Sequence, residues 1–282
     1  LRRGWGSRIT KYWRYALGIS LPFIPHTLGM VVLTQLDRIM ITKMLGNSDT
    51  GLYSFGVAYA SIFALASNAI AQAFQPWLYQ NYSENNMVLI KKAANTIVLG
   101  ISFLIVLIVA FGPEVIKLLG PENFWDSKYV IMPVVVGSFF QFLAAIYSSI
   151  QLYHKKTYFI PVGTLLSALV NIGLNLILIP ILGIKGAAFG LLLSFLVQSL
   201  FHMVIYKRVA KSILFDDGYM WRVTGYTVVS SYLIFLVYDL VLLRFLITLF
   251  VILLLYLFQK RSVDSLLLSI WKIADPRKIK LF

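Results

Sequence analysis

The sequence predicts an all-α, polytopic membrane protein with about eight transmembrane helices. Of its 282 residues, 59% are hydrophobic and 13% are charged, and the mean hydropathy is +0.81. Ordinary soluble domains do not combine these values. Apolar stretches long enough to cross a bilayer alternate with short polar joints. The expected spans are residues 15–45, 52–80, 93–119, 129–152, 158–182, 185–206, 223–240 and 242–258.

The distribution of Lys and Arg predicts the orientation of these spans. Of the 25 basic residues, 19 lie on one side, in residues 1–14, 79–92, 153–157, 207–222 and 259–282. The other side carries four, namely Lys117, Lys128, Lys185 and Arg244. By the positive-inside rule the rich side is cytoplasmic, which places both termini in the cytoplasm. The net charge of +14 then suits anionic lipid headgroups, and no nucleic-acid partner is expected.

The first span combines two prolines with two adjacent charges. Pro22 and Pro25 each lack a backbone donor, so a kink or locally opened helix is expected near them. Asp37 and Arg38 follow within the outer half of the span or at its outer end. A polar helix face is formed by Thr27, Thr34, Arg38 and Thr42, at steps of seven and four residues. This face lines a cavity or is a helix end whose charges reach the outer headgroups.

The second span carries the clearest polar stripe. Its members are Ser61, Asn68, Gln72, Gln75 and Tyr79, at spacings of 7, 4, 3 and 4. Amides are costly on a lipid-facing surface, so this face is expected to line a cavity or to bond to another helix. Pro76 is expected to bend the span near its cytoplasmic end. The third span reads as packing or lipid-facing, and the fourth ends in a basic turn at residues 153–157.

The fifth and sixth spans form a tight hairpin. Ser167, Asn171 and Asn175 lie four residues apart on one face, where the asparagines either bond between helices or face a cavity. Small residues at 186–188 are expected to let the two helices approach closely. Residues 223–258 then form a nearly uniform apolar hairpin, followed at 259–282 by an expected amphipathic cytoplasmic tail.

Sequence motifs for catalysis are not found. No P-loop, GxSxG, HExxH or GxGxxG pattern occurs in its required context, and there is no cysteine. The three histidines lie in different segments, so no metal site and no other cofactor is expected. The chain is therefore expected not to be an enzyme. The alternative is a membrane glycosyl transferase or ligase using outer carboxylates, for which the residues are Glu114, Glu122, Asp126 and Asp239.

Several short runs occur in an order that resembles a known family. They are residues 21–26 (LPFIPH), 37–41 (DRIMI), 45–46 (LG), 51–54 (GLYS), 74–77 (FQPW) and 155–157 (KKT), then Asn171, Asn175, Ile179-Pro180, Gly183 and Gly186-Ala187-Ala188. Together they resemble the second half of bacterial polysaccharide and O-antigen repeat-unit flippases. These belong to the multidrug/oligosaccharidyl-lipid/polysaccharide exporter (MOP) superfamily. The resemblance covers about residues 15–205.

The resemblance implies two six-helix bundles that face each other across a cavity. Residues 15–206 would form the second bundle, residues 207–258 two additional helices, and residues 1–14 a basic cytoplasmic segment. The other bundle, from an N-terminal part of the same protein, would be the partner. The implied function is to flip undecaprenyl-diphosphate-linked oligosaccharide across the bacterial inner membrane by alternating access. Membrane lipid and the lipid-linked oligosaccharide are the expected ligands.

Roles for individual residues follow as hypotheses. Asn68, Gln72 and Gln75 are expected to bond sugar hydroxyls, and Arg38 to contact the diphosphate. Asp37 balances that charge or carries a coupling proton, with H⁺ and Na⁺ both open as coupling ions. Asn171 and Asn175 are further cavity residues. Two alternatives within the superfamily are a drug or cation exporter and a flippase for peptidoglycan precursors.

Overall fold

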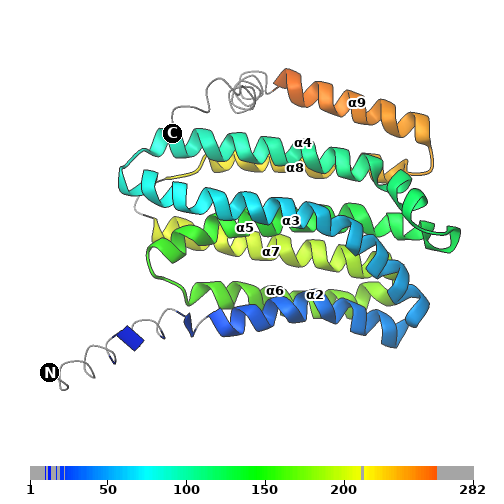
Figure 1. Cartoon of the computed structure of the whole chain (residues 1–282), viewed down its shortest axis with the longest axis horizontal. Helices are drawn as coiled ribbons and strands as arrows, with labels where there is room; N and C mark the ends of the chain where they lie inside the picture. The colour runs from blue at the N-terminus through cyan, green and yellow to red at the C-terminus, as the bar shows by residue number, and fades with distance from the viewer. Residues whose placement is uncertain are drawn as a thin grey trace, which may run out of the picture. The chain divides into compact units, whose positions relative to one another are not determined.

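The computed structural model is all-helical over the part of the chain that it describes. That part comprises residues 10, 12, 13, 17, 20, 21, 23–210 and 213–258. The α-helices are α2 (Phe23–Met44), α3 (Asn47–Ser83), α4 (Met87–Leu119), α5 (Lys128–Tyr153), α6 (Phe159–Leu182), α7 (Ile184–Val209), α8 (Asp217–Leu236) and α9 (Val241–Phe258), with a 3-10 helix η1 (Glu122–Ser127) before α5 (Figure 1).

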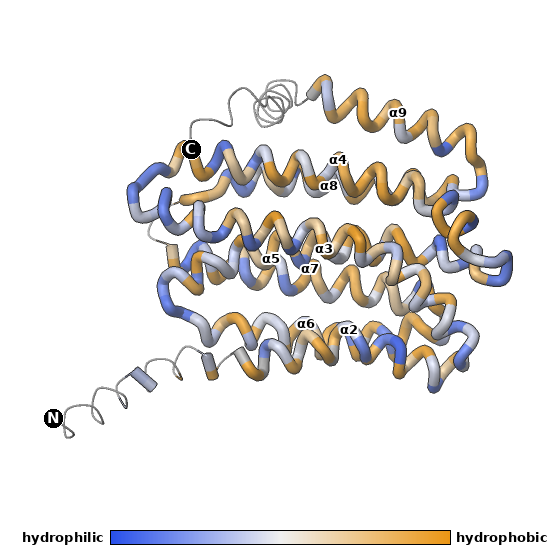
Figure 2. The backbone as a smooth tube through the Cα atoms, in the orientation of Figure 1, coloured by the Kyte–Doolittle hydropathy of each residue, from blue (hydrophilic) through white to orange (hydrophobic). Residues whose placement is uncertain are grey.

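The all-helical prediction is confirmed, and the helices fall on the predicted apolar stretches. Five segments are long and apolar enough to cross a membrane: 47–83, 87–119, 122–153, 159–182 and 184–209. Figure 2 shows hydrophobic residues along the helices and hydrophilic residues concentrated near their ends. The count of eight spans stays a prediction. The predicted basic segment and amphipathic tail lie mostly or wholly outside the described residues.

Several helix boundaries differ from the predicted spans. The joint predicted between residues 80 and 93 shrinks to Glu84–Asn86, where Asn85 adopts a left-handed φ of 63°. The predicted spans were defined by apolar residues, which end near the lipid headgroups. A helix can continue beyond them into water, so α3 and α4 are longer than the spans predicted for them. α8 begins earlier than predicted, because the Asp216 side chain accepts a hydrogen bond from the Tyr219 N–H at 3.0 Å and caps the helix.

The prolines of the first span lie at a helix start. Pro22 is outside the described residues, and Pro25 falls in the first turn of α2. Proline is tolerated there, because the first-turn N–H groups have no partner within the helix. Pro76 lies inside α3, which continues to Ser83. The kinks at Pro22, Pro25 and Pro76 stay predictions.

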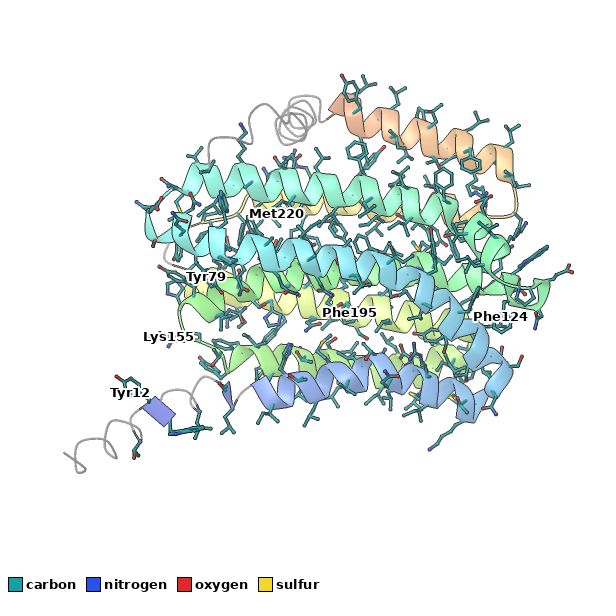
Figure 3. All side chains as sticks on the ribbon, in the orientation of Figure 1. Tyr12, Tyr79, Phe124, Lys155, Phe195 and Met220 are labelled. Atoms are coloured by element: carbon teal, nitrogen blue, oxygen red, sulfur yellow. The ribbon has the colours of Figure 1, made fainter. Side chains whose placement is uncertain are left out.

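The chain divides into two compact units. Unit 1 comprises residues 1–55 and 137–212, and unit 2 comprises residues 56–136 and 213–282. In unit 1, α6 packs against both α2 and α7, and Figure 1 shows these three helices side by side. Phe195 of α7, labelled in Figure 3, is 3% exposed and belongs to the core of unit 1. The division into a bundle at 15–206 and two helices at 207–258 stays a prediction.

Unit 2 is built around α4. α4 packs against α8, α9 and η1, and α8 packs against α9. The side of α4 that faces these neighbours is apolar, with Val98, Ile105 and Val109 all fully buried. The exposed side chains of α9, such as Leu242, Leu249 and Phe250, are also apolar, as expected for helices surrounded by lipid.

Glycine sets the geometry of the α6–α7 hairpin. Gly183 joins the two helices with a φ of 62°, a conformation that costs glycine little. At Gly186 an added Cβ would lie 2.2 Å from the carbonyl oxygen of Leu178 in α6. The first turn of α7 therefore lies directly against the α6 backbone, as the small residues at 186–188 predict.

Replacing Gly186 by alanine is expected to destabilise the hairpin. The new methyl group overlaps backbone, so the helices must separate, at a cost of about 1–3 kcal/mol. The melting temperature of purified protein in detergent measures the effect. Gly173→Ala is the matched control, because this exposed glycine of α6 has nothing within 4 Å of its Cβ position. Equal melting temperatures for the two variants would contradict the close contact.

Candidate functional site

A buried polar row follows one face of α6. Thr164, Ser167, Asn171 and Asn175 are each fully buried and are spaced three, four and four residues apart. On α7 a matching row passes through Gly190, Ser194, Gln198 and His202 at steps of four. The Ser167 hydroxyl joins the rows by donating to the Ser194 carbonyl at 2.9 Å. We call the eight residues of these two rows the polar track of unit 1.

One end of the polar track holds a buried carboxyl group. Asp37 of α2 is 0% exposed. Its Oδ1 accepts a hydrogen bond from Asn175 Nδ2 at 2.6 Å, and its Oδ2 accepts one from the Tyr53 hydroxyl at 2.7 Å. The Asn175 amide also approaches Asn171 Oδ1 at 3.3 Å. Asp37 is thus held by a neutral amide and a neutral hydroxyl from α6 and the start of α3.

The asparagines keep unused hydrogen-bonding capacity beside Asp37. Asn175 Oδ1 and Asn171 Nδ2 are buried and have no partner within the described residues. Gly190 of α7 makes room for this arrangement, because a Cβ there would lie 2.6 Å from Asn175 Oδ1. A buried carboxylate is costly without a compensating positive charge. With an unused amide oxygen beside it, this arrangement can take up a proton or a small cation.

The other end of the polar track contains two histidines. His26 Nδ1 of α2 lies 2.6 Å from the Thr164 hydroxyl, to which Gln198 Nε2 donates at 3.3 Å. His202 Nδ1 of α7 lies 3.1 Å from Gln151 Nε2 and 3.2 Å from Gln151 Oε1. His202 is 2% exposed. Polar side chains from α2, α5, α6 and α7 therefore meet at this end.

Arg38 lies beside Asp37 in sequence but on another face of α2. Its guanidinium donates to Gln35 Oε1 at 3.0 Å, and its Nε is buried without a partner in the described residues. Thr27, Thr34 and Thr42, predicted to share its face, are all exposed. The hydroxyls of Thr34 and Thr42 donate to carbonyls one turn earlier in the helix, which satisfies them without a second helix.

The predicted stripe of α3 lies on an exposed face in unit 2. Asn68 and Gln72 are exposed, and half-buried Gln75 donates to the Tyr79 hydroxyl at 2.6 Å. Small side chains surround the two exposed amides, at Ala69, Ala73 and Pro76. The exposed faces of α6 and α9 instead carry bulky aliphatic residues, including Leu169, Leu176, Ile181, Leu242, Leu246 and Leu249. Between residues 68 and 76, the exposed face of α3 is thus more polar and less bulky than these surfaces, whereas earlier in the helix Ile62 and Leu65 are also exposed.

Two of the outer carboxylates lie in ion pairs of unit 2. Glu114 of α4 pairs with Arg244 of α9, which is 0% exposed and also donates to the Tyr238 carbonyl at 2.7 Å. Asp239 accepts from Lys128 Nζ at 2.5 Å and from the Tyr129 hydroxyl at 2.7 Å. The Lys128 ammonium, followed by the Tyr129 hydroxyl, lowers the pKa of the Asp239 carboxyl. The carboxylates of Glu114 and Asp239 therefore stabilise the region around the α8–α9 turn.

The structure thus brings together some predicted residues and not others. Asp37, Asn171 and Asn175 form one cluster, whereas Arg38 lies on a different face of α2 and the α3 amides belong to unit 2. The sequence prediction missed Tyr53, Thr164, Gln198 and the His26 and His202 contacts. Thr164 had a signal, because it lies three residues before Ser167 on the same face. No group of three or more potential metal ligands occurs in the described part of the chain.

Comparisons with known proteins add information about the fold. No family model matches the chain. A protein of the Lsg locus (protein 1) of Haemophilus influenzae is 34% identical over 74 residues, which are 26% of this chain and 18% of that protein. The solved structure of a MOP superfamily transporter from Pyrococcus furiosus matches 78% of this chain with a TM-score of 0.52 and 17% identity. Over the matched part, this chain shares the helical fold of that protein.

The similarity concerns only part of each relative. The chain spans about half of the Pyrococcus furiosus protein, 52% of its length, and a much smaller share of the Haemophilus influenzae protein. For the Pyrococcus furiosus transporter, a reverse polarity of the binding pocket is said to suggest a different function. At 17% identity the likeness establishes the helical fold, and the activity of this chain has to be argued from its own residues.

A double-mutant cycle tests the ionised state of Asp37. A hydrogen bond to a charged group contributes about 1.5–3 kcal/mol, and one to a neutral group about 0.5–1.5 kcal/mol. We therefore expect Tyr53→Phe to destabilise the native protein more than it destabilises the Asp37→Asn variant, as measured by unfolding in detergent. Tyr79→Phe, which removes a hydroxyl bonded to the neutral Gln75, is the control. Equal costs in both backgrounds would show that Asp37 is neutral.

Proposed function

We propose that this chain is the second half of a MOP-type flippase. It moves undecaprenyl-diphosphate-linked oligosaccharide across the bacterial inner membrane by alternating access, for polysaccharide biosynthesis. The observation that carries the proposal is the buried Asp37 carboxyl, held by Tyr53 and Asn175 inside apolar helices. Ionisable groups buried in a membrane bundle are costly and usually serve transport. The transporter fold and the ordered sequence runs support the same function.

Asp37 is proposed to bind the coupling ion, H⁺ or Na⁺. Either ion neutralises the carboxylate and removes the cost of its burial. A proton adds a donor that unused acceptors such as Asn175 Oδ1 can receive, and Na⁺ gains oxygen ligands from the same groups. The ion-free and ion-bound states therefore differ in charge within a low-dielectric interior. Such a difference can bias the equilibrium between inward-open and outward-open conformations.

The cargo headgroup is proposed to meet the polar faces of α2 and α3. A sugar diphosphate cannot enter hydrocarbon unaided, because its charges and hydroxyls would lose water. Arg38 keeps a buried N–H without a partner in the described residues, which suits a diphosphate oxygen. The exposed amides of Asn68 and Gln72 suit sugar hydroxyls, while the lipid tail remains in the bilayer. In the intact transporter, the other bundle is proposed to provide the remaining wall of the cavity.

Neutralising Asp37 is expected to abolish coupled transport. Asp37→Asn keeps the shape and can still accept from Tyr53, but it cannot bind and release an ion. Export is measured as surface glycan in a flippase-null strain that expresses the intact transporter at matched levels. Glu122→Gln, which removes an exposed carboxylate from η1, should export normally. Dissipating the proton gradient or the Na⁺ gradient separately identifies the ion. Wild-type export by Asp37→Asn would overturn the coupling role.

Removing the proposed cargo contacts is expected to reduce export without unfolding the protein. Arg38→Ala should lower export at least tenfold, because a charge-assisted contact contributes about 1.5–3 kcal/mol. Gln72→Ala should lower it several-fold. Gln80→Ala, an exposed amide near the end of the same helix, is the control. Unchanged export by both Arg38→Ala and Gln72→Ala would remove the site assignment. Loss of small cationic amphiphile export instead of glycan export would favour a drug exporter.

A further inference from the structure

We propose that His26 and His202 form a second ion site in unit 1, which binds one proton. The site is completed by Thr164, Gln151 and Gln198, and it lies at the opposite end of the polar track from Asp37. The inference rests on the proposed function and extends it, because it adds a second buried binding site for the coupling ion of Asp37.

The Gln151 amide can form a hydrogen bond with His202 in both the neutral and the protonated state of the ring. The Nδ1 atom of His202 lies nearly equidistant from both ends of the Gln151 amide, at 3.1 Å from Nε2 and 3.2 Å from Oε1. A neutral imidazole with a lone pair on Nδ1 accepts from Nε2. A protonated ring instead donates from Nδ1 to Oε1. Both states of His202 therefore have a partner at this position without movement of either helix.

The Thr164 hydroxyl can likewise form a hydrogen bond with His26 in both protonation states. The hydroxyl of Thr164 lies 2.6 Å from His26 Nδ1, and a hydroxyl can donate to a neutral ring or accept from a protonated one. It also accepts from Gln198 Nε2 at 3.3 Å and reaches the Ile160 carbonyl at 3.2 Å. When His26 is protonated, the Thr164 hydroxyl can keep its donation to Ile160. The site thus contains two ring nitrogens whose neighbours tolerate a proton.

Two buried oxygens without a partner lie within about one turn of His202 on α7. Gln198 Oε1 and Ser199 Oγ are buried and have no partner within the described residues. Gln198 is 4% exposed and lies one helical turn before His202 on α7. A buried oxygen without a donor costs about 1–3 kcal/mol. A donor that reaches these oxygens, such as a protonated imidazole or a water molecule that it orders, would remove this cost.

Two glycines allow side chains of the histidine site to pack closely against neighbouring helix backbones. A Cβ at Gly163 would lie 2.7 Å from His202 Nε2, and one at Gly29 would lie 2.9 Å from the Thr164 methyl carbon. The His202 ring therefore packs directly against α6, next to Thr164. The two glycines allow polar groups of α2, α6 and α7 to meet in a layer that alanine would force apart.

The surrounding charges oppose a second proton at this site. Burial opposes a charge on either ring, and a charge on His26 further opposes one on His202. The groups facing them from α5 and α6 are the neutral Gln151 and Thr164. At the same end of unit 1, the α5–α6 turn contributes Lys155, labelled in Figure 3, and Lys156, and α7 ends with Lys207 and Arg208. These cations oppose a second proton.

The polar track connects the two ion sites. From Thr164 it passes through Ser167, bonded to the Ser194 carbonyl, to Asn171 and Asn175 beside Asp37. His26 and Asp37 are eleven residues apart in α2, which corresponds to about 16 Å along the helix. In the predicted topology the histidine site lies nearer the cytoplasm and Asp37 nearer the outside. A proton bound at one site is thus separated from the other by part of the membrane thickness.

Nuclear magnetic resonance of the imidazoles tests this proposal directly. The intact protein is labelled with ¹⁵N-histidine in lipid nanodiscs and titrated from pH 4 to pH 8, with signals assigned from His26→Gln, His202→Gln and His154→Gln. We expect His26 and His202 to share one proton. In His26→Gln, the midpoint of His202 should rise, because the opposing ring is gone.

Several outcomes separate this proposal from the proposed function. Both rings staying neutral to pH 4, or a His202 midpoint unaffected by His26→Gln, would overturn the shared proton site. In transport assays, His202→Gln should shift the dependence on cytoplasmic pH, while His154→Gln should not. An unshifted His202→Gln profile would remove the site from the transport path. If Asp37→Asn exports normally while the histidines titrate as a pair, the coupling role of Asp37 fails and the histidine site stands.

Discussion

The structure of unit 1 depends on the need to satisfy polar groups that water cannot reach. Asp37 is fully buried, so its two oxygens must take their hydrogen bonds from other segments. They do so from Asn175 of α6 and Tyr53 at the start of α3, which fixes α2 against both. Helix association in lipid gains little from apolar contact, so interhelical polar bonds of this kind select one register over its neighbours. A shift of one turn would leave a carboxylate without donors.

Small side chains make that polar interior possible. Gly190 leaves space for the Asn175 amide, Gly163 for the His202 ring and Gly29 for the Thr164 side chain. In each case the helix backbone itself forms the wall of the polar layer. In these three pairs, a side chain of the polar layer on one helix lies opposite a glycine on the next. Larger residues would part the helices and leave the amides and rings without partners.

The sequence predicted the elements better than their connections. Hydropathy located the helices because lipid demands apolar side chains, but it missed their ends in water, as at Glu84–Asn86 and at the Asp216 cap. The four-residue period of Ser167, Asn171 and Asn175 predicted a polar face on α6, and the structure buries that face. Its partners Asp37 and Tyr53 were not predicted as such, because contacts between helices depend on register and crossing angle. The periodicity of a single helix gives no information about register or crossing angle. For the same reason, the contacts of His26 with Thr164 and of His202 with Gln151 were not predicted.

The two most buried charged side chains of the described residues, Arg244 and Asp37, are stabilised in different ways. Arg244 of unit 2 is fully buried, and it is neutralised by Glu114 and further fixed by the Tyr238 carbonyl. Breaking that pair would strand a charge, so the pair suits a permanent connection between α4 and α9. Asp37 takes its hydrogen bonds from groups that carry no formal charge, and the next residue, Arg38, acts on it electrostatically while donating its own hydrogen bond to Gln35. A permanent anchor gains from a full ion pair, whereas neutral hydrogen-bond partners suit a carboxyl group that is proposed to bind and release a cation in turn. The neutral hydrogen-bond partners of Asp37 are therefore the feature on which its proposed ion exchange rests.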